Sequence, residues 1–277
     1  MKFTKMHGAG NDFIIINNMD GQIPESRLPE LARRLCAQRT AIGADGMMVV
    51  IPARAGADYG MLFYNSDGSL GEMCGNGARC ICRYGYEKGL AGTRQRVETT
   101  AGLVTGERID NTNYRIRLND PSVIETQRCV SISGKDYDCA YVELGCPGIP
   151  HAIVVYPGWE RADRTQLREL GRALRFAPEF PRGANLSFVD VKSEGEVDII
   201  TFERGVEDFT LACGTGCGSV AAALFRRGVC GRELRLNAPG GLLHTELCGN
   251  GEDIDDIFLT GPTCLVFEGE LSAQMLG

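Results

Sequence analysis

Short apolar runs that end at glycine or Asp/Asn turns dominate the chain, while helical spacing is confined to a few stretches. The apolar runs 13–16, 47–51 and 59–64 end or begin at such turns and predict strands. The segment 78–88 lacks proline and stops at Gly89, which predicts a helix closed by a C-terminal glycine. Many short strands and few helices favour an α+β fold, in which a curved or barrel-like, mostly antiparallel sheet surrounds a central helix.

The second half of the chain repeats the first at one constant shift. Cys74 and Cys213 lie 139 positions apart (213 − 74), and the same shift carries Gly89 onto Gly228. It also carries Leu28, Leu31 and Leu35 onto Leu167, Leu170 and Leu174, and the strand 13–16 onto 152–155. Agreement over so many positions predicts an internal duplication. We therefore expect two similar domains, residues 1–120 and 121–263, with the functional site in the cleft between them and the last segment, 264–277, returning to the first domain.

The length and composition of the chain make a nucleic-acid-binding or membrane protein unexpected. The length of 277 residues suits two domains that each bury a core, and 29 Lys and Arg against 36 Asp and Glu make a nucleic-acid surface unexpected. No apolar run approaches the roughly 20 residues that span a bilayer, and the N-terminus lacks the apolar core of a signal peptide. We therefore expect a cytoplasmic protein without a membrane partner, whose 12 cysteines are mostly reduced and buried.

Two of these cysteines stand in a special context. The segment 72–79 places Cys74 before a Gly-x-Gly turn and a helix, and 211–218 does the same with Cys213. At a helix N-terminus the N–H groups and the dipole favour a thiolate and can hold a carboxylate. Two such thiols facing each other could remove an α-proton from one face of an amino acid and deliver a proton to the other. This chemistry requires neither a metal nor pyridoxal phosphate, because helix N–H groups can stabilise the carbanion.

A set of motifs runs through the chain in order. They are MHGAGNDF at 6–13, NSDGS at 65–69, MCGNGAR at 73–79, ERG at 203–205 and ACGTG at 212–216. In these motifs the chain closely resembles the diaminopimelate epimerases. The resemblance implies cofactor-independent epimerisation of LL-diaminopimelate to the meso form, a step of lysine biosynthesis, with Cys74 and Cys213 as the thiol/thiolate pair. It also implies a homodimer.

The resemblance further implies a set of ligands for a small amino-acid substrate. The reacting carboxylate and amine would lie near Asn11 and the backbone of Gly75, Asn76, Gly214 and Thr215, and the distal end near Asn65, Asn185, Glu203 and Arg204. A guanidinium suits a carboxylate, and a glutamate suits an ammonium group. His151 and Glu203 would assist proton movement near the thiols. The constant shift also sets Arg204 against Asn65 (65 + 139).

Two positions depart from the family pattern. Ile149 stands where many members have an asparagine that contacts the distal end, and Gly46 stands where some carry glutamine. Isoleucine makes no side-chain hydrogen bond, so either a neighbour replaces the asparagine or the substrate's far end differs. Two alternatives therefore stay open. One is a racemase of another amino acid, such as histidine; the other is a non-catalytic amino-acid-binding protein, for which a pair of cysteines has no evident use.

Several of these residues also have a purely structural interpretation. Cys80, Cys82 and Cys217 lack the paired spacing of a zinc site and are interpreted as packing, so no metal is expected. Glu203 and Arg204, as neighbours on a strand, would ordinarily point to opposite faces and be solvated. Only the family resemblance and the shift make these two residues candidate ligands.

Overall fold

The structure of the chain is a computed structural model that describes residues 1–54, 56–71 and 74–276. Glu72 and Met73 of the first cysteine motif lie outside the described residues. Backbone contacts divide the chain into unit 1, Met1–Ile116 with Gly261–Gly277, and unit 2, Arg117–Thr260. The expected boundaries after residues 120 and 263 stay a prediction for independently folding domains.

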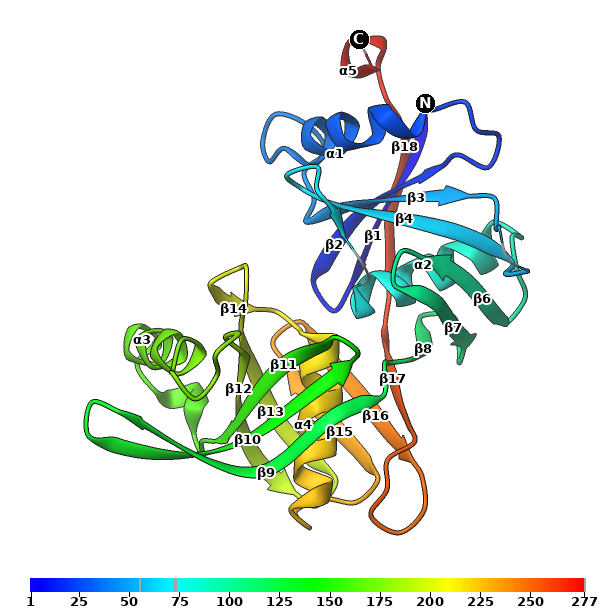
Figure 1. Cartoon of the computed structure of the whole chain (residues 1–277). Helices are drawn as coiled ribbons and strands as arrows, with labels where there is room; N and C mark the ends of the chain where they lie inside the picture. The colour runs from blue at the N-terminus through cyan, green and yellow to red at the C-terminus, as the bar shows by residue number, and fades with distance from the viewer. Residues whose placement is uncertain (55, 72–73, 277) are drawn as a thin grey trace. The chain divides into compact units, whose positions relative to one another are not determined.

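Unit 1 wraps a mostly antiparallel sheet around helix α2 (Gly75–Glu87), which packs against the first, second and seventh strands (Figure 1). Helix α1 (Leu28–Cys36) packs on β3 and β4 through Leu28 and Leu35, which are buried. Its remaining helical segments are η1 (Glu25–Arg27) and α5 (Ala273–Leu276). The strands are β1 (Lys2–Gly8), β2 (Asn11–Asn17), β3 (Gly46–Ile51), β4 (Tyr59–Asn65), β5 (Leu70–Gly71), β6 (Arg94–Thr99), β7 (Gly102–Arg108), β8 (Asn113–Arg117) and β18 (Cys264–Glu270).

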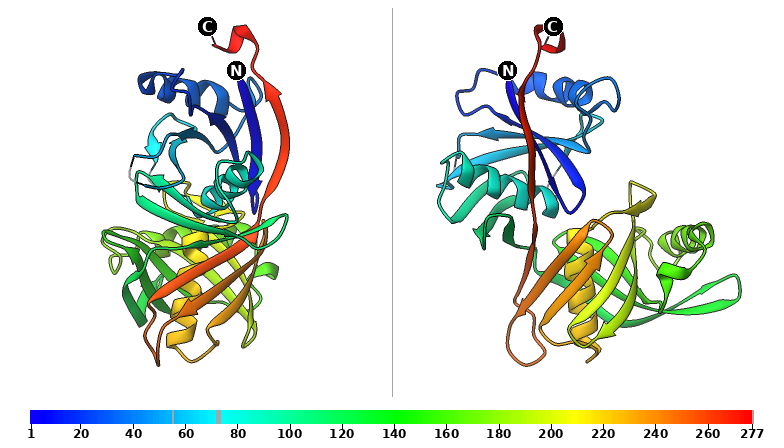
Figure 2. Two further views of the ribbon diagram at one scale, coloured as in Figure 1. Left: turned by 90° about the vertical axis from the view of Figure 1, so that its right-hand side faces the viewer. Right: turned by 180° about the vertical axis from the view of Figure 1, so that it is seen from behind.

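Within unit 1, strands far apart in the sequence lie side by side. β18 pairs antiparallel with β1, from Lys2 opposite Glu270 to His7 opposite Cys264, so the red and blue strands run together in both views (Figure 2). β1 also pairs antiparallel with β2, whereas β2 and β3 pair in parallel. The C-terminal segment thus completes the sheet that begins at the N-terminus.

Unit 2 wraps its own sheet around helix α4 (Gly214–Arg226), which is buried over most of its length. Gly218 lets the sheet approach closely, because a Cβ there would lie 2.6 Å from Cδ1 of Leu118. The other helical segments are η2 (Trp159–Arg161) and α3 (Arg164–Arg175). The strands are β9 (Pro121–Ile132), β10 (Lys135–Gly145), β11 (Gly148–Val155), β12 (Asn185–Ser193), β13 (Glu196–Glu203), β14 (Asp208–Thr210), β15 (Glu233–Ala238), β16 (Gly241–Cys248) and β17 (Asp256–Pro262).

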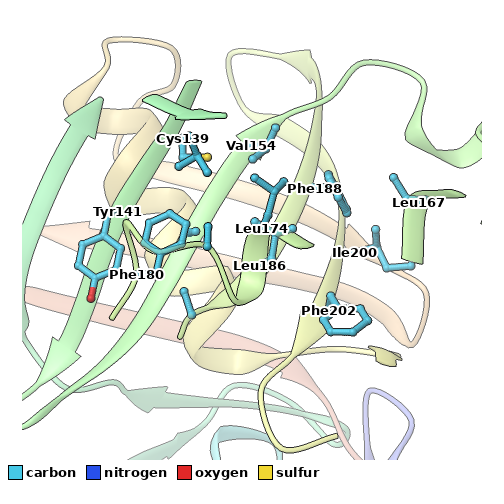
Figure 3. Packing of buried hydrophobic residues seen from close by; sticks show 14 of the residues in the cluster. Cys139, Tyr141, Val154, Leu167, Leu174, Phe180, Leu186, Phe188, Ile200 and Phe202 are labelled. Atoms are coloured by element: carbon cyan, nitrogen blue, oxygen red, sulfur yellow. The ribbon is translucent and has the colours of Figure 1, made fainter. Parts of the chain in front are cut away.

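The opposite face of this sheet packs against α3. Leu167 and Leu174 of α3 are buried in one cluster with Phe188 and Phe202 of the strands, and Figure 3 shows these side chains together. The predicted α+β fold, a mostly antiparallel sheet around one helix in each unit, is confirmed. The cleft between the domains stays a prediction. None of the helices among the described residues is long and apolar enough to cross a membrane.

The internal duplication is visible in matching elements. Helices α2 and α4 are both 13 residues long and begin 139 positions apart. Each is followed by a glycine with a positive φ, 68° at Gly89 and 67° at Gly228. Hairpin β6–β7 pairs Thr99 with Gly102, and hairpin β15–β16 pairs their counterparts in the same register. The constant shift therefore describes the helices and the hairpins that follow them.

The shift fails by one residue in the strands before the helices. Phe13 pairs with Gly46 in unit 1, whereas His151 pairs with Asn185 in unit 2. If Gly46 corresponds to Asn185, Phe13 corresponds to His151 and not to Ala152, the counterpart that the constant shift predicts. The connection that contains α3 is one residue longer than the connection that contains α1, and loops tolerate such insertions.

The same correction applies at the ends of β4 and β13. Gly46 lies opposite Asn65, and Leu186 lies opposite Phe202, so the same register continued by one pair sets Asn185 opposite Glu203. With Gly46 matched to Asn185, Asn65 then corresponds to Glu203, one position before Arg204, the counterpart that the constant shift predicts. The connection between β12 and β13 is one residue shorter than its counterpart, and the segment from the end of β13 to α4 is one residue longer, which restores the 139-residue shift in α4.

Candidate active site

Both candidate cysteines cap a helix. Cys74 is the N-cap of α2 with φ −121° and ψ 123°, and Cys213 is the N-cap of α4 with φ −113° and ψ 113°. The backbone carbonyl of each cysteine accepts the first helical hydrogen bond, from the N–H of Ala78 in α2 and from that of Cys217 in α4. The first N–H groups of a helix have no intrahelical acceptor and favour an anion. The structure thus places an equivalent helix N-terminus directly after each cysteine.

In unit 1 the thiol of Cys74 contacts the side-chain amide of Asn11. The Cys74 thiol donates to Oδ1 of Asn11, 3.2 Å away, and Nδ2 of Asn11 donates to Oδ2 of Asp45 at 2.5 Å. Asp45 and Asp12 also exchange bonds: Oδ2 of Asp45 accepts from the Asp12 N–H at 3.1 Å, and Oδ1 of Asp12 accepts from the Asp45 N–H at 2.8 Å. An ionised carboxylate only accepts hydrogen bonds, so Asp45 fixes the amide with its carbonyl toward the thiol.

The first turn of α2 contains a buried charged group. Asn76 is 3% exposed, and its Oδ1 accepts from Nη2 of Arg79, which has no exposed surface, at 2.7 Å. Gly8 of β1 lies against this turn, because a Cβ at Gly8 would be 2.8 Å from the Asn76 carbonyl oxygen. The close packing holds the backbone of the turn in place.

Asn65 is the last residue of β4 and pairs with Gly46 of β3. Nδ2 of Asn65 donates to Oγ of Ser69 at 2.9 Å, so the NSDGS turn orients the amide. A Cβ at Gly46 would lie 2.5 Å from Cε2 of Phe63 and 2.8 Å from the carbonyl oxygen of Tyr64. The Phe63 ring therefore fills the space that a glutamine at position 46 would need.

In unit 2 the thiol is more deeply buried. Cys213 is 7% exposed, and burial raises the pKa of its thiol well above the ordinary value; the charge of Glu203 raises it further. Hydrogen bonds from the Thr215 hydroxyl and the Gly216 N–H act in the opposite direction, and the Cys217 thiol lies nearby. These environments favour the protonated thiol unless a donor stabilises the thiolate.

A buried imidazole lies next to this thiol. Nε2 of His151 is 3.0 Å from Oγ1 of Thr215, which is 3.6 Å from Sγ of Cys213. His151 has no exposed surface, and burial, together with the charge of Arg204, lowers its pKa to about 3. The imidazole is therefore neutral at physiological pH and can orient a hydrogen bond without carrying a charge.

Asn185 joins two loops of unit 2. Its Oδ1 accepts from the backbone N–H of Arg204 at 2.8 Å, and its Nδ2 donates to the carbonyl oxygen of Pro150 at 3.4 Å. Asn185 is only 5% exposed. Both ends of the amide are therefore used within unit 2, and Asn185 ties the turn before His151 to the Glu203–Gly205 loop.

Arg182 holds the turn that contains Ile149. Its Nη1 donates to the Gly148 carbonyl oxygen at 3.3 Å, and its Nη2 pairs with Oε1 of Glu143 at 2.5 Å. The carbonyl oxygen of Arg182 accepts from Nη1 of Arg204 at 3.4 Å. Arg182, which the sequence did not single out, thus links the turn before Ile149 to Arg204.

The predicted residues therefore gather in two groups, and each group contains one thiol. Asp45, Arg182 and the side chain of Thr215 were not predicted, because a turn carboxylate, an exposed arginine and a helix hydroxyl carry no distinctive sequence signal. Cys80 and Cys82 are buried thiols whose pKa values burial raises. In the described ranges, no three His, Cys, Asp or Glu side chains gather as a metal site.

Comparison with known proteins agrees with this architecture. The family model described as diaminopimelate epimerase matches residues 3–123 and 146–266, two stretches of equal length. A diaminopimelate epimerase of Aquifex aeolicus (strain VF5) is 37% identical, covering 100% of this chain and 99% of the relative. Those of Desulfitobacterium hafniense and Archaeoglobus fulgidus are 36% and 35% identical, covering 100% and 99% of this chain and 100% and 97% of the relatives.

Solved structures share the fold at low sequence identity. A probable proline racemase from Agrobacterium radiobacter K84, with bound carbonate, has a TM-score of 0.69 and 18% identity, covering 98% of this chain and 93% of that one. A PhzF-family phenazine biosynthesis protein of Bacillus anthracis has a TM-score of 0.70 and 14% identity, covering 98% and 99%. At these identities the likeness concerns the fold alone.

Proposed function

Because the chain belongs to the diaminopimelate epimerase family, we propose that it interconverts LL- and meso-diaminopimelate by moving the proton on one α-carbon. The observation that supports this most is the matched pair of cysteines, each the N-cap of a 13-residue helix. A binding protein would need the helix N-termini for the carboxylate but would have no use for a thiol at each.

We propose that Cys74 and Cys213 act as a two-base pair. The thiolate of one takes the α-proton and becomes a thiol, and the electron pair of the C–H bond is delocalised into the carboxylate. The thiol of the other donates its proton to the opposite face and becomes the thiolate, so charge and protons balance. The N–H groups at Gly75, Asn76, Gly214 and Thr215 would stabilise the carboxylate, because negative charge is favoured at a helix N-terminus.

The distal end of the substrate needs a cation and an anion. We propose that the guanidinium of Arg204 binds the distal carboxylate, that Glu203 binds the distal ammonium group, and that Asn65 is a further ligand of the distal end. Asn185 would act mainly by holding the Arg204 loop, since its Oδ1 accepts the Arg204 N–H at 2.8 Å. His151 would assist the reaction at Cys213 indirectly, by orienting the Thr215 hydroxyl, which lies 3.0 Å from its Nε2, and not by carrying the proton itself.

A racemase of another amino acid, such as histidine, is the second candidate. The supporting observation is Ile149, which offers the distal end no hydrogen bond at the turn that Arg182 holds. A substrate with an apolar or ring-shaped far end would suit this turn better than an amino-acid head group. The two candidates share the cysteine chemistry and differ in the far end of the substrate.

Incubation in D2O separates these candidates. LL-diaminopimelate, L-histidine and L-lysine are incubated separately with the protein, and deuterium at the α-carbon is followed by NMR. We expect deuterium to enter diaminopimelate; entry into histidine alone would overturn the first proposal, and entry into none would favour the binding protein. Cys74→Ala and Cys213→Ala should each abolish epimerisation, and near-normal turnover in either variant would contradict the two-base pair.

We further propose that the protein acts in the cytoplasm as a homodimer, without a metal or pyridoxal phosphate. Val266 and Phe267 of β18 are 51% and 45% exposed, and an edge with such apolar side chains suits a second copy. Sedimentation velocity should give a dimer for the wild type and a monomer for Val266→Lys. Dialysis against EDTA followed by hydroxylamine should leave the epimerase rate unchanged.

A further inference from the structure

The hydroxyl group of Thr215 lies between the thiol of Cys213 and the imidazole of His151. Oγ1 of Thr215 is 3.6 Å from Sγ of Cys213 and 3.0 Å from Nε2 of His151. Thr215 occupies the second position of α4, directly after the N-cap and Gly214, and α4 packs against β11, which carries His151. The three side chains belong to one unit and are placed by a helix and a strand rather than by flexible loops.

The direction of this hydrogen-bond chain follows from the other nitrogen of the imidazole. Nδ1 of His151 is buried and has no hydrogen-bond partner among residues 1–54, 56–71 and 74–276. A buried N–H without an acceptor is rarer and costlier than a buried lone pair without a donor. The favoured neutral tautomer therefore carries its proton on Nε2, and Nε2–H donates to Oγ1 of Thr215. The hydroxyl proton of Thr215 is then directed away from His151, toward the sulfur of Cys213.

The groups around the Cys213 thiol determine how much a hydrogen bond from Thr215 stabilises the thiolate. Burial, the carboxylate of Glu203 and the thiol of Cys217 all disfavour a thiolate at Cys213, whereas Thr215 and the Gly216 N–H favour it. Arg204 acts on His151 and helps to keep the imidazole neutral. The thiolate that a two-base reaction requires thus depends on hydrogen bonds within the first turn of α4.

We propose that Thr215 is a positioning residue whose hydroxyl, oriented by Nε2–H of His151, donates to the sulfur of Cys213 and stabilises the thiolate. No proton is transferred along the chain: His151 stays neutral, Thr215 keeps its hydrogen, and Cys213 alone gains and loses the α-proton. This role goes beyond the backbone contact that the family resemblance implies for Thr215. This proposal rests on the proposed function in one respect: the proposed epimerisation is what makes the Cys213 thiolate a reacting group.

Alkylation of Cys213 tests the proposal without turnover. The full-length protein carrying Cys74→Ala is treated with iodoacetamide at fixed pH, and modification of the Cys213 peptide is followed by mass spectrometry. Only the thiolate reacts, and losing a hydrogen bond to the charged sulfur lowers the fraction of thiolate at a fixed pH. We therefore expect Thr215→Val to slow alkylation by roughly 10-fold or more, because one pKa unit is a tenfold change in thiolate.

Thr215→Ser is the matched control, because it keeps the hydroxyl and loses the methyl group. It should alkylate within about threefold of the parent protein, since the donor remains. His151→Gln should fall between the two, because the hydroxyl is present but less well oriented. Alkylation of Thr215→Val as fast as the parent, or faster, overturns the proposal.

Kinetics supply the second measurement. In the protein with both cysteines, Thr215→Val should lower kcat and kcat/KM together, with KM little changed, because the lost bond stabilises the reacting thiolate and not the bound substrate. A rise in KM alone would contradict this role. Failure of the wild type to exchange diaminopimelate would sink the proposed function and leave the alkylation result standing, so the two failures are distinguishable.

Discussion

Replacing Asn185 with alanine removes both hydrogen bonds that tie the two distal loops of unit 2 together. The backbone N–H of Arg204 loses an acceptor at 2.8 Å, and the carbonyl oxygen of Pro150 loses a donor at 3.4 Å. A buried polar group without a partner costs about 1–3 kcal/mol. The Arg204 bond is only partly buried and the Pro150 bond is long, so we expect each loss to fall near the low end, and the free energy of unfolding to drop by about 2 kcal/mol.

The assay combines urea unfolding with steady-state kinetics. Asn185→Ala should lower the urea midpoint at unchanged slope and raise KM for diaminopimelate at least tenfold, because the loop that carries Arg204 is released. Asn65→Ala is the control, since its Nδ2 bonds the exposed hydroxyl of Ser69 and its loss should cost less than about 1 kcal/mol. If Asn185→Ala unfolds like the wild type while KM rises, Asn185 contacts the substrate directly and does not tie the loops.

Three further substitutions test single contacts. Asp45→Asn should lower kcat/KM about tenfold, measured by epimerisation rate, because the amide of Asn11 is then free to turn its NH2 group toward the thiol. Gly46→Gln should destabilise the fold by about 1–3 kcal/mol in urea unfolding, since its Cβ would lie 2.5 Å from the Phe63 ring, and Phe63→Leu should recover part of the loss. Arg182→Gln should raise KM with little change in kcat, because the turn before Ile149 loses its anchor to Gly148.

The sequence was sufficient to predict the repeated architecture and the start of a helix at each of the two cysteines. Glycines after each cysteine and a constant shift identify the helix N-caps, because the N-cap geometry depends on local residues. One constant shift could not represent three one-residue differences between the repeats: an extra residue before β12, a missing residue between β12 and β13, and an extra residue before α4. Phe13 and His151 were consequently not recognised as counterparts.

The sequence did not predict side-chain contacts between residues far apart in the chain. Asp45 looked like an ordinary turn carboxylate, and only the pairing of β2 with β3 brings it to Asn11. The long hairpin of β9 and β10 was not predicted either, because polar and apolar residues mix without clear alternation over 121–138, and only the following run 139–142 is continuously buried. Pattern analysis finds buried elements and local caps, and it misses partners that topology alone brings together.

The correspondence of Phe13 with His151 leads to a substitution that makes unit 2 resemble unit 1. The buried Phe13 ring lies 3.5 Å from the position of a Cβ at Gly77, in the first turn of α2, so an aromatic side chain fits beside this helix in the other repeat. His151→Phe should therefore fold, while Thr215 loses the donor at 3.0 Å that orients its hydroxyl. We expect kcat to fall about tenfold, the effect of losing roughly one hydrogen bond.

The same variant has a pH signature. The pKa of His151 falls from 6.5 to about 3 in the folded state because of burial first and the charge of Arg204 second, so the unfolded chain binds a proton that the folded chain does not. Wild-type stability should therefore lose up to about 1.4 kcal/mol per pH unit from this residue as the pH falls below about 6.5 toward about 3. In His151→Phe this contribution disappears, so its stability relative to the wild type should rise in urea unfolding at pH 7, 6 and 5. Parallel slopes in the two proteins would mean that His151 takes up its proton in the folded state, and a charged imidazole would then have to be reconsidered beside Cys213.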